Sequence, residues 1–193
     1  MKFFIIMLFI ISCETSTNPE YKKSKIIERV ANLEETPEWA NGIKTMWVEK
    51  NKVYFVHSTD MSGDARPSAC LKAASLGAKI EMLKFLKENI VTSGQFNESD
   101  AISDPAYESL TSFLNKGNIS GAAVSKKYWE KVEVSETSGE RKLKLRCVAK
   151  VSIKKSDLER QLKEATKKDS KGNKEVREKL IKAQTDFIEG LAD

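Results

Sequence analysis

Few side chains in this sequence have the chemistry of a nucleophile or a transition-metal ligand. The chain contains one histidine and three cysteines, which are His57, Cys13, Cys70 and Cys147. No serine or cysteine near His57 lies in a recognisable nucleophile motif. A zinc site takes several His or Cys ligands, and these residues are widely separated in the sequence. We therefore expect no catalytic histidine, no bound metal and no cofactor.

The acidic residues are the second source of chemistry. A cluster formed by Asn97, Glu98, Asp100 and Asp104 lacks the spacing and the glycine of a calcium-binding loop. The chain also has no glycine-rich phosphate loop after a strand, no HExxH and no G-x-S-x-G motif. A glycosidase needs only a pair of carboxylates, which no sequence pattern reveals. A hydrolase therefore stays among the alternatives and ranks last.

The third chemical feature is a cysteine near the start of the chain. Lys2 precedes an apolar run over residues 3–11, which is typical of a signal peptide and shorter than the about 20 residues of a transmembrane helix. The sequence I-I-S-C over residues 10–13 resembles the lipobox of bacterial lipoproteins. This resemblance implies cleavage before Cys13 and stable anchoring by acyl chains on that residue. An ordinary secretory signal is the alternative. In enterobacterial lipoproteins an aspartate after the cysteine retains the protein in the inner membrane. By resemblance to that sorting, Glu14 at this position implies the outer membrane.

Four segments follow from this pattern: a signal peptide at 1–12, a lipidated tether at 13–35, one domain at 36–154 and a helical extension at 155–193. Apolar residues at helical spacing within 26–33 predict a short helix at the end of the tether. Charged residues make up 32% of the chain, with a formal net charge of +5. Since acids are interleaved with the lysines near the C-terminus, we expect a solvated helical face and no nucleic-acid partner.

Two hairpins are predicted by alternating apolar residues and polar turns. The first joins strands at 44–49 and 52–57, and the second joins strands at 122–134 and 142–153. The last strand alternates so regularly that one face should be buried and the other wet and basic. Cys147 points to the buried face, and Cys70 lies on a helix expected to cover it. A disulfide between them is one option, and two buried free thiols are the favoured one.

Helices fill the space between and after the hairpins. Pro67 opens a long helix that ends at 93–94, and its predicted buried face consists of Ala69, Ala73, Leu76, Ile80, Leu83 and Ile90. Asp104 caps a second helix that ends near 116. A capping box at 156–159 opens a C-terminal helix, which is interrupted at 169–173 and then continues. We expect this extension to pack back on the domain, with pairing to another subunit as the alternative.

The order hairpin, helices, hairpin predicts an α+β fold, with an antiparallel sheet of about four strands and helices on one face. The small side chains of the long helix permit close approach by a partner, and large aromatic residues serve as core anchors or as interface hot spots. The candidate interaction surface therefore consists of Trp39, Ala69, Ala73, Gly77 and Trp129.

With these elements placed, the chain resembles the LPP-twenty family of outer-membrane lipoproteins, which includes FlgP-type flagellar lipoproteins. The resemblance covers about residues 36–154. It rests on the lipobox at Cys13, the Pro37-x-Trp39 entry, the Asp64-Ala65-Arg66 start of an alanine-rich helix and the Trp129 strand. Pro67 and the lysine-rich end after Ile153 depart from the family pattern. The resemblance implies a non-enzymatic envelope protein, and several members of the family oligomerise around surface structures.

Three functions are open on this basis. The first is a lipid-anchored structural or interaction module that associates with itself or with another envelope protein. The second is a lipid-anchored binder of a small ligand, in a pocket between sheet and helices lined by Trp47, Tyr54 or Trp129. The third is the hydrolase. The sequence names neither the partner nor the oligomer size, nor the side of the membrane that the domain faces.

Overall fold

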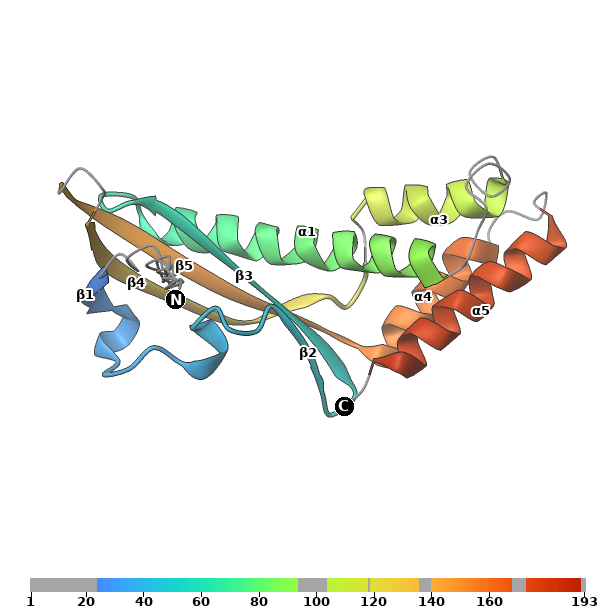
Figure 1. The fold of residues 1–193 in the computed structure, drawn as a ribbon, viewed down its shortest axis with the longest axis horizontal. Helices are drawn as coiled ribbons and strands as arrows, with labels where there is room; N and C mark the ends of the chain where they lie inside the picture. The colour runs from blue at the N-terminus through green and yellow to red at the C-terminus, as the bar shows by residue number, and fades with distance from the viewer. Residues whose placement is uncertain (1–23, 94–103, 118, 136–139, 168–172, 192–193) are drawn as a thin grey trace, which may run out of the picture.

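The computed structural model describes residues 24–93, 104–117, 119–135, 140–167 and 173–191. Its centre is an open antiparallel sheet of five strands in the order β1-β4-β5-β3-β2 (Figure 1). The strands are β1 (Ser24–Arg29), β2 (Met46–Glu49), β3 (Lys52–Ser62), β4 (Ala123–Ser135) and β5 (Arg141–Lys154). The expected α+β fold with its two hairpins is therefore confirmed, and the sheet has one strand more than expected.

The additional strand, β1, lies in the segment expected to be a tether ending in a short helix. It pairs antiparallel with β4, with Ile26 opposite Val132, and a single 3-10 turn, η1 (Val30–Asn32), follows it. The expected helix is wrong, because two adjacent isoleucines gain more by pairing with a distant strand than their helical spacing provides locally. The sheet thus begins at Ser24, well inside the 13–35 segment.

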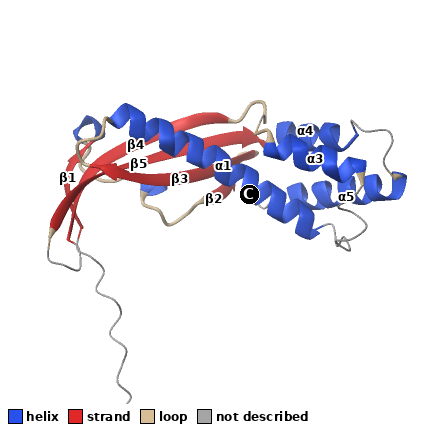
Figure 2. Cartoon of the chain, turned by 90° about the horizontal axis from the view of Figure 1, so that it is seen from above, coloured by secondary structure: helices blue, strands red, loops and turns tan. Residues whose placement is uncertain are grey.

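Helix α1 (Pro67–Ser93) runs along one face of the sheet (Figure 2). Its contacts with the sheet are made mainly with β3 and β5. The buried positions recur every four residues, and none is more than 1% exposed: Cys70, Ala74, Ala78, Met82 and Leu86.

The predicted buried face of α1 is therefore displaced from the observed one. Leu76 is 60% exposed and Ile80 is 41% exposed, so both lie on the outer side. Ala69 is exposed as well, while Ala73 and Leu83 are half-buried, and the side chain of Ile90 lies outside the described residues. Both stripes have helical spacing and begin with small residues. The observed stripe stays small as far as Ala78, whereas the predicted one already contains Leu76, so the observed stripe permits the closer approach to the sheet.

The remaining helices pack beyond one end of the sheet, around the C-terminal half of α1 (Figure 2). They are α3 (Pro105–Asn115), α4 (Lys155–Lys167) and α5 (Lys174–Gly190). One core joins them to the sheet, since Leu162 and Leu180 share it with Phe55 and Val151. The extension therefore packs back on the domain, as expected. No helix in the described segments is long and apolar enough to span a bilayer.

Capping explains where α3 begins. The carboxylate of Asp104 accepts hydrogen bonds from the backbone N–H of Ala106 at 2.8 Å and of Asn173 at 2.9 Å. The first bond caps α3, as the sequence predicts. The second ties the start of α3 to the start of α5, so that one side chain fixes two helices of the bundle.

The face of the sheet opposite α1 is covered in its centre by the segment between β1 and β2, which includes the turn η2 (Glu38–Ala40). A small core there contains Ala40, Val56, Tyr128 and Val148, each 5% exposed or less. The expectation that this face of β5 is wet is therefore wrong at Val148. An apolar residue stands there among basic ones, and the covering segment buries it.

Candidate functional site

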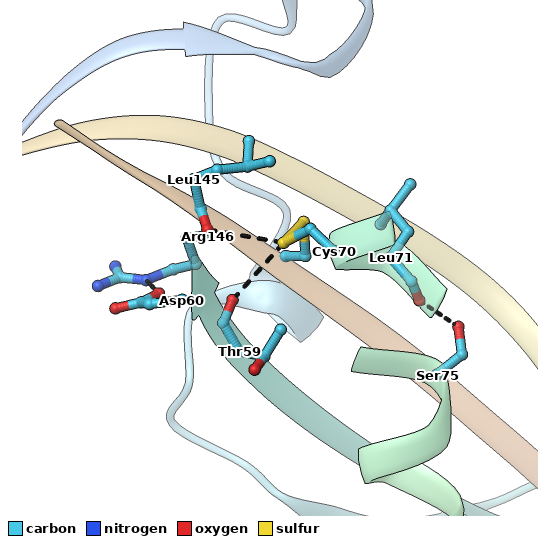
Figure 3. Close-up of a disulfide and its surroundings, with 8 residues drawn as sticks. Thr59, Asp60, Cys70, Leu71, Ser75, Leu145 and Arg146 are labelled. Atoms are coloured by element: carbon cyan, nitrogen blue, oxygen red, sulfur yellow. Dashed lines mark hydrogen bonds and ion pairs between the residues drawn. A yellow bond between two sulfur atoms is a disulfide. The ribbon is translucent and has the colours of Figure 1, made fainter. Parts of the chain in front are cut away.

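The cysteine pair is bonded in the structure, in contrast to the favoured expectation of free thiols. Cys70 of α1 and Cys147 of β5 form a disulfide that spans 77 residues of sequence, with their Cα atoms 5.8 Å apart. Both residues are fully buried. The sulfur of Cys70 lies 3.6 Å from the carbonyl oxygen of Leu145 (Figure 3). Since a disulfide sulfur carries no hydrogen, this approach is a packing contact and not a hydrogen bond. The bond fixes the first turn of α1 to the centre of the sheet.

The helix approaches the sheet most closely at Gly77. A Cβ atom built at this position would lie only 2.7 Å from Cγ of His57 and closer still to two other atoms of the ring. His57 belongs to β3 and pairs with Ala149 of β5. Gly77 therefore faces the sheet and not the outer surface, so its role is to make room for the imidazole ring. Within the described residues, His57 belongs to no group of three or more His, Cys, Asp or Glu side chains that could hold a metal ion.

The residues of the predicted interaction surface do not come together in the fold. On α1, Ala69 is exposed, Ala73 is half-buried and Gly77 faces the sheet. Trp129 packs beside the disulfide on the α1 face, and Trp39 lies on the opposite face, against the core around Tyr128. Trp39 and Trp129 therefore act as core anchors, one on each face of the sheet.

A cation surrounded by aromatic rings lies on the face opposite α1. The ammonium of Lys150 is 5.5 Å from the ring centre of Trp39, 5.2 Å from that of Trp47 and 4.8 Å from that of Tyr54. Trp47 and Tyr54 are stacked, with their ring centres 5.2 Å apart. These ring faces favour the charged ammonium. Burial and the charge of Lys126 lower the pKa of Lys150.

A hollow of about 470 Å³ adjoins this cluster and is lined in part by Trp39, Trp47, Ile43 and Lys150. Ile43 is 79% exposed. The hollow therefore combines an apolar floor with a cation, but it lies on the far side of the sheet from the helices. Trp47 and Tyr54, two of the residues expected to line a pocket between sheet and helices, lie instead with Lys150 on the face opposite α1. A hollow that does lie between β3 and α1 is lined by Phe55, His57 and Phe85.

A buried carboxylate forms the second polar centre. Glu130 is 3% exposed, and its Oε2 accepts hydrogen bonds from Tyr128 at 2.7 Å and from Thr36 at 2.9 Å. Its Oε1 lies 3.6 Å from the guanidinium of Arg146, which also contacts Asp60 at 3.1 Å. The Glu130 carboxylate is thus satisfied by two hydroxyls and one cation, as a buried charge requires.

This polar centre lies at the wall of a hollow of about 630 Å³, lined by Ser58, Thr59, Asp60, Glu130 and Arg146 of the sheet and by Thr36, Ala40, Asn41 and Gly42 of the covering segment. Figure 3 shows Arg146 and Asp60 on the side of the strands away from Cys70. Two carboxylates flank one cation here, which suits binding of a polar or cationic group more than nucleophilic chemistry.

We expect the change Tyr128→Phe to lower the free energy of unfolding at pH 7 by about 2 kcal/mol, because the lost hydroxyl donates a hydrogen bond to the charged carboxylate of Glu130. Burial raises the pKa of Tyr128, and Glu130 adds to this effect, while the hydrogen bond with Thr36 opposes it. The folded protein therefore keeps this proton to a higher pH than the unfolded chain. The resulting stabilisation is complete below about pH 10 and is lost as the pH rises through the folded-state pKa.

Urea unfolding of wild type and Tyr128→Phe across neutral and alkaline pH measures this effect. The difference in unfolding free energy between the two proteins should decrease above about pH 10. Tyr107→Phe, a change in α3 beyond the end of the sheet (Figure 2), controls for the removal of a phenol hydroxyl as such. A difference that grows with alkaline pH would contradict the assignment.

The remaining sequence candidates are placed as follows. Asp104 is a helix cap, and the rest of the acidic cluster at 97–100 lies outside the described residues, as does Cys13. No family model, no curated protein and no solved structure matches this chain.

Proposed function

We propose that this protein is an exported, lipid-anchored bacterial envelope protein that acts by binding other proteins and not by catalysis. The proposal combines the lipobox at Cys13 with the fold described above. The observation that carries it is the buried Cys70–Cys147 disulfide. Structural disulfides form and persist outside the reducing cytoplasm, so this bond is what an exported domain would contain.

The position of the sheet also supports anchoring close to a membrane. Ser24 begins β1, and only residues 14–23 separate it from Cys13. An extended chain spans at most about 3.5 Å per residue. Since eleven residue steps separate Cys13 from Ser24, the sheet would stay within about 40 Å of the acylated cysteine, which favours contact with partners at the outer-membrane surface.

An interaction role is supported by apolar side chains on the outer side of α1. Leu76 and Ile80 are 60% and 41% exposed, about one turn apart, with Ala73 beside them. Isolated exposed apolar residues are ordinary on a protein surface, but here they follow one another along a helix. This stripe is a second feature, besides the open sheet, through which a structural protein could contact its neighbours.

The anchor is tested by changing Cys13→Ser in the full chain, expressed in a bacterium supplied with labelled palmitate. Wild type should incorporate the label and lose residues 1–12, whereas Cys13→Ser should do neither. The double variant Cys70→Ala/Cys147→Ala keeps Cys13 and serves as the matched control, since it should be labelled like wild type. Label retained by Cys13→Ser, or absent from wild type, would exclude lipid anchoring at this residue.

The alternative is a lipid-anchored binder of a small ligand. The observation in its favour is the hollow of about 630 Å³ beside the buried Glu130. Native mass spectrometry of the protein released from membranes would detect a bound small molecule. A ligand lost on changing Arg146→Ala would support this function, and a mass equal to that of the lipidated chain alone would count against it.

A further inference from the structure

The sheet has one edge that is only half paired. β2 pairs with the first four residues of β3, from Lys52 to Phe55. The N–H of Val56 then donates to the carbonyl oxygen of Thr45 at 2.8 Å. Beyond this point no strand of the described chain pairs with the outer side of β3.

The unpaired groups on this edge can be assigned from the ladder. Backbone groups alternate sides along an antiparallel strand. Since Val56 points its N–H outward to Thr45, Ser58 and Asp60 also turn their N–H and C=O groups outward. Both residues are exposed. Four backbone hydrogen-bonding groups are therefore presented to a further strand.

Hollows flank this edge on both faces of the sheet. The hollow of about 630 Å³ is lined by Ser58 and Asp60 on the face away from α1. A second hollow, of about 450 Å³, is lined by His57 and Ser58 of β3 together with Phe85 of α1. An open edge with space on both sides suits strand addition, in which side chains of the added strand point alternately to the two faces.

The charge around the edge is acidic, although the chain as a whole carries +5. Four carboxylates and two cationic side chains line the two hollows: Asp60, Glu81, Glu88 and Glu130 against Lys84 and Arg146. Arg146 pairs with Asp60 and Glu130, and Lys84 pairs with Glu81, so four negative and two positive charges leave an excess of two negative charges. The complementary strand is therefore a basic one, and this edge is poorly matched to a copy of itself.

Strand β1 at the other end of the sheet has the complementary character. It pairs only with β4, so its outer edge is also open in the described chain. Its sequence contains Lys25, the residues immediately before it are Lys22 and Lys23, and Ile27 is 52% exposed. We propose that β1 of one copy docks on the Ser58–Asp60 edge of β3 in a second copy, so that the two sheets join edge to edge.

This contact makes a second copy of the chain the partner and the two open strand edges the binding surfaces. The inference rests on the protein-binding function proposed above. The two edges differ, so each docked pair still presents one free β1 and one free β3. Such head-to-tail contacts generate rings or filaments and not closed twofold dimers.

Site-directed disulfide formation tests the contact in the full chain. Two differently tagged copies are expressed together in bacterial cells, one with Ser24→Cys and the other with Ser58→Cys, and intact cells are oxidised. Ser24 pairs with Val134, on the same face of the sheet as Ser58. Residues on neighbouring strands lie about 5 Å apart, within the Cα separation of a disulfide. The native Cys70 and Cys147 are already bonded to each other.

The expected result is a product that contains both tags. Ile27→Cys in place of Ser24→Cys covers a second register of the two strands. Ser125→Cys is the matched control, because Ser125 is an exposed serine of the interior strand β4, and it should give only background. Failure of both β1 positions to couple to Ser58→Cys, or coupling only between identical variants, would overturn the proposal.

A backbone variant provides an independent test. Ser58→Pro removes one outward N–H, and proline is tolerated on an open strand edge. In detergent-solubilised full chain, this change should shift the particle mass measured by light scattering from an assembly to the single chain. An unchanged assembly would overturn the proposal. A protein that incorporates palmitate on Cys13 but yields no mixed product would refute the edge contact alone and leave lipid anchoring standing.

Discussion

Changing both Cys70→Ala and Cys147→Ala is expected to lower the free energy of unfolding by about 4 kcal/mol. The disulfide closes a loop of 77 residues, and the chain-entropy model gives about 4 to 5 kcal/mol for a loop of this length. Without the bond, the start of α1 is held to the sheet by apolar packing alone, for example of Ala74 and Leu71 in the cluster that contains Leu145 and Trp129. We expect this end of the helix to become the least stable part of the described fold.

Urea unfolding under oxidising and reducing conditions measures this effect. Reductant should bring wild type close to the double alanine variant and should leave that variant unchanged. The double variant is preferred to either single one, because a lone thiol can pair between molecules. Equal stability of oxidised and reduced wild type would show that the bond contributes nothing.

The change Gly77→Ala is expected to destabilise the protein by about 1 to 3 kcal/mol through overpacking against His57. The new Cβ would fall 2.7 Å from Cγ of the ring and closer to other ring atoms, so the whole imidazole must move. In an open helix the same change gains about 1 kcal/mol from helix propensity. Here steric overlap outweighs that gain.

A double-mutant cycle separates the two effects, with unfolding free energies as the measurement. In a His57→Ser background, Gly77→Ala should stabilise the protein instead, so the sign of the substitution reverses. Gly190→Ala is the matched control near the end of α5, where a Cβ meets no atom within 4 Å. Destabilisation of similar size in both backgrounds would show that Gly77 is needed for another reason.

Local sequence patterns predict the elements of this fold well and their contacts less well. The alternation in β5 and the turn before it establish the second hairpin, and Asp104 correctly marks the start of α3. Strand β1 is missed because Ile26 and Ile27 fit helical spacing locally, whereas their partner on β4 lies about a hundred positions later in the chain. A pattern within a short window of sequence cannot predict a pairing between strands that lie so far apart in the chain.

The orientation of α1 shows the same limit. Its two apolar stripes have equal spacing, and only the approach to the sheet decides which one is buried. The sequence signal for the buried stripe is Cys70, because a disulfide with Cys147 on the buried face of β5 fixes which face of the helix meets the sheet.

The polar centre could have been found in part from the predicted hairpin. Glu130 stands directly opposite Arg146 in the register of β4 and β5, so an acid and a base at facing positions were available. The contribution of Thr36 could not be found in this way, because it depends on the covering segment crossing the sheet. The ring cluster around Lys150 depends on the same crossing through Trp39.

The order of the strands has a mechanical consequence. If the chain is lipid-anchored as proposed, a pull between the membrane and a partner reaches the described part of the fold first at Ser24, and β1 is held by a single ladder to β4. Tension would therefore peel this terminal strand before it reached the core, while the Cys70–Cys147 bond kept α1 and β5 together. When docked on a neighbouring copy, β1 would be hydrogen-bonded along both of its edges, to β4 of its own chain and to β3 of the neighbour. Assembly would thus convert a strand that is held on one side only into a joint that shares load between molecules.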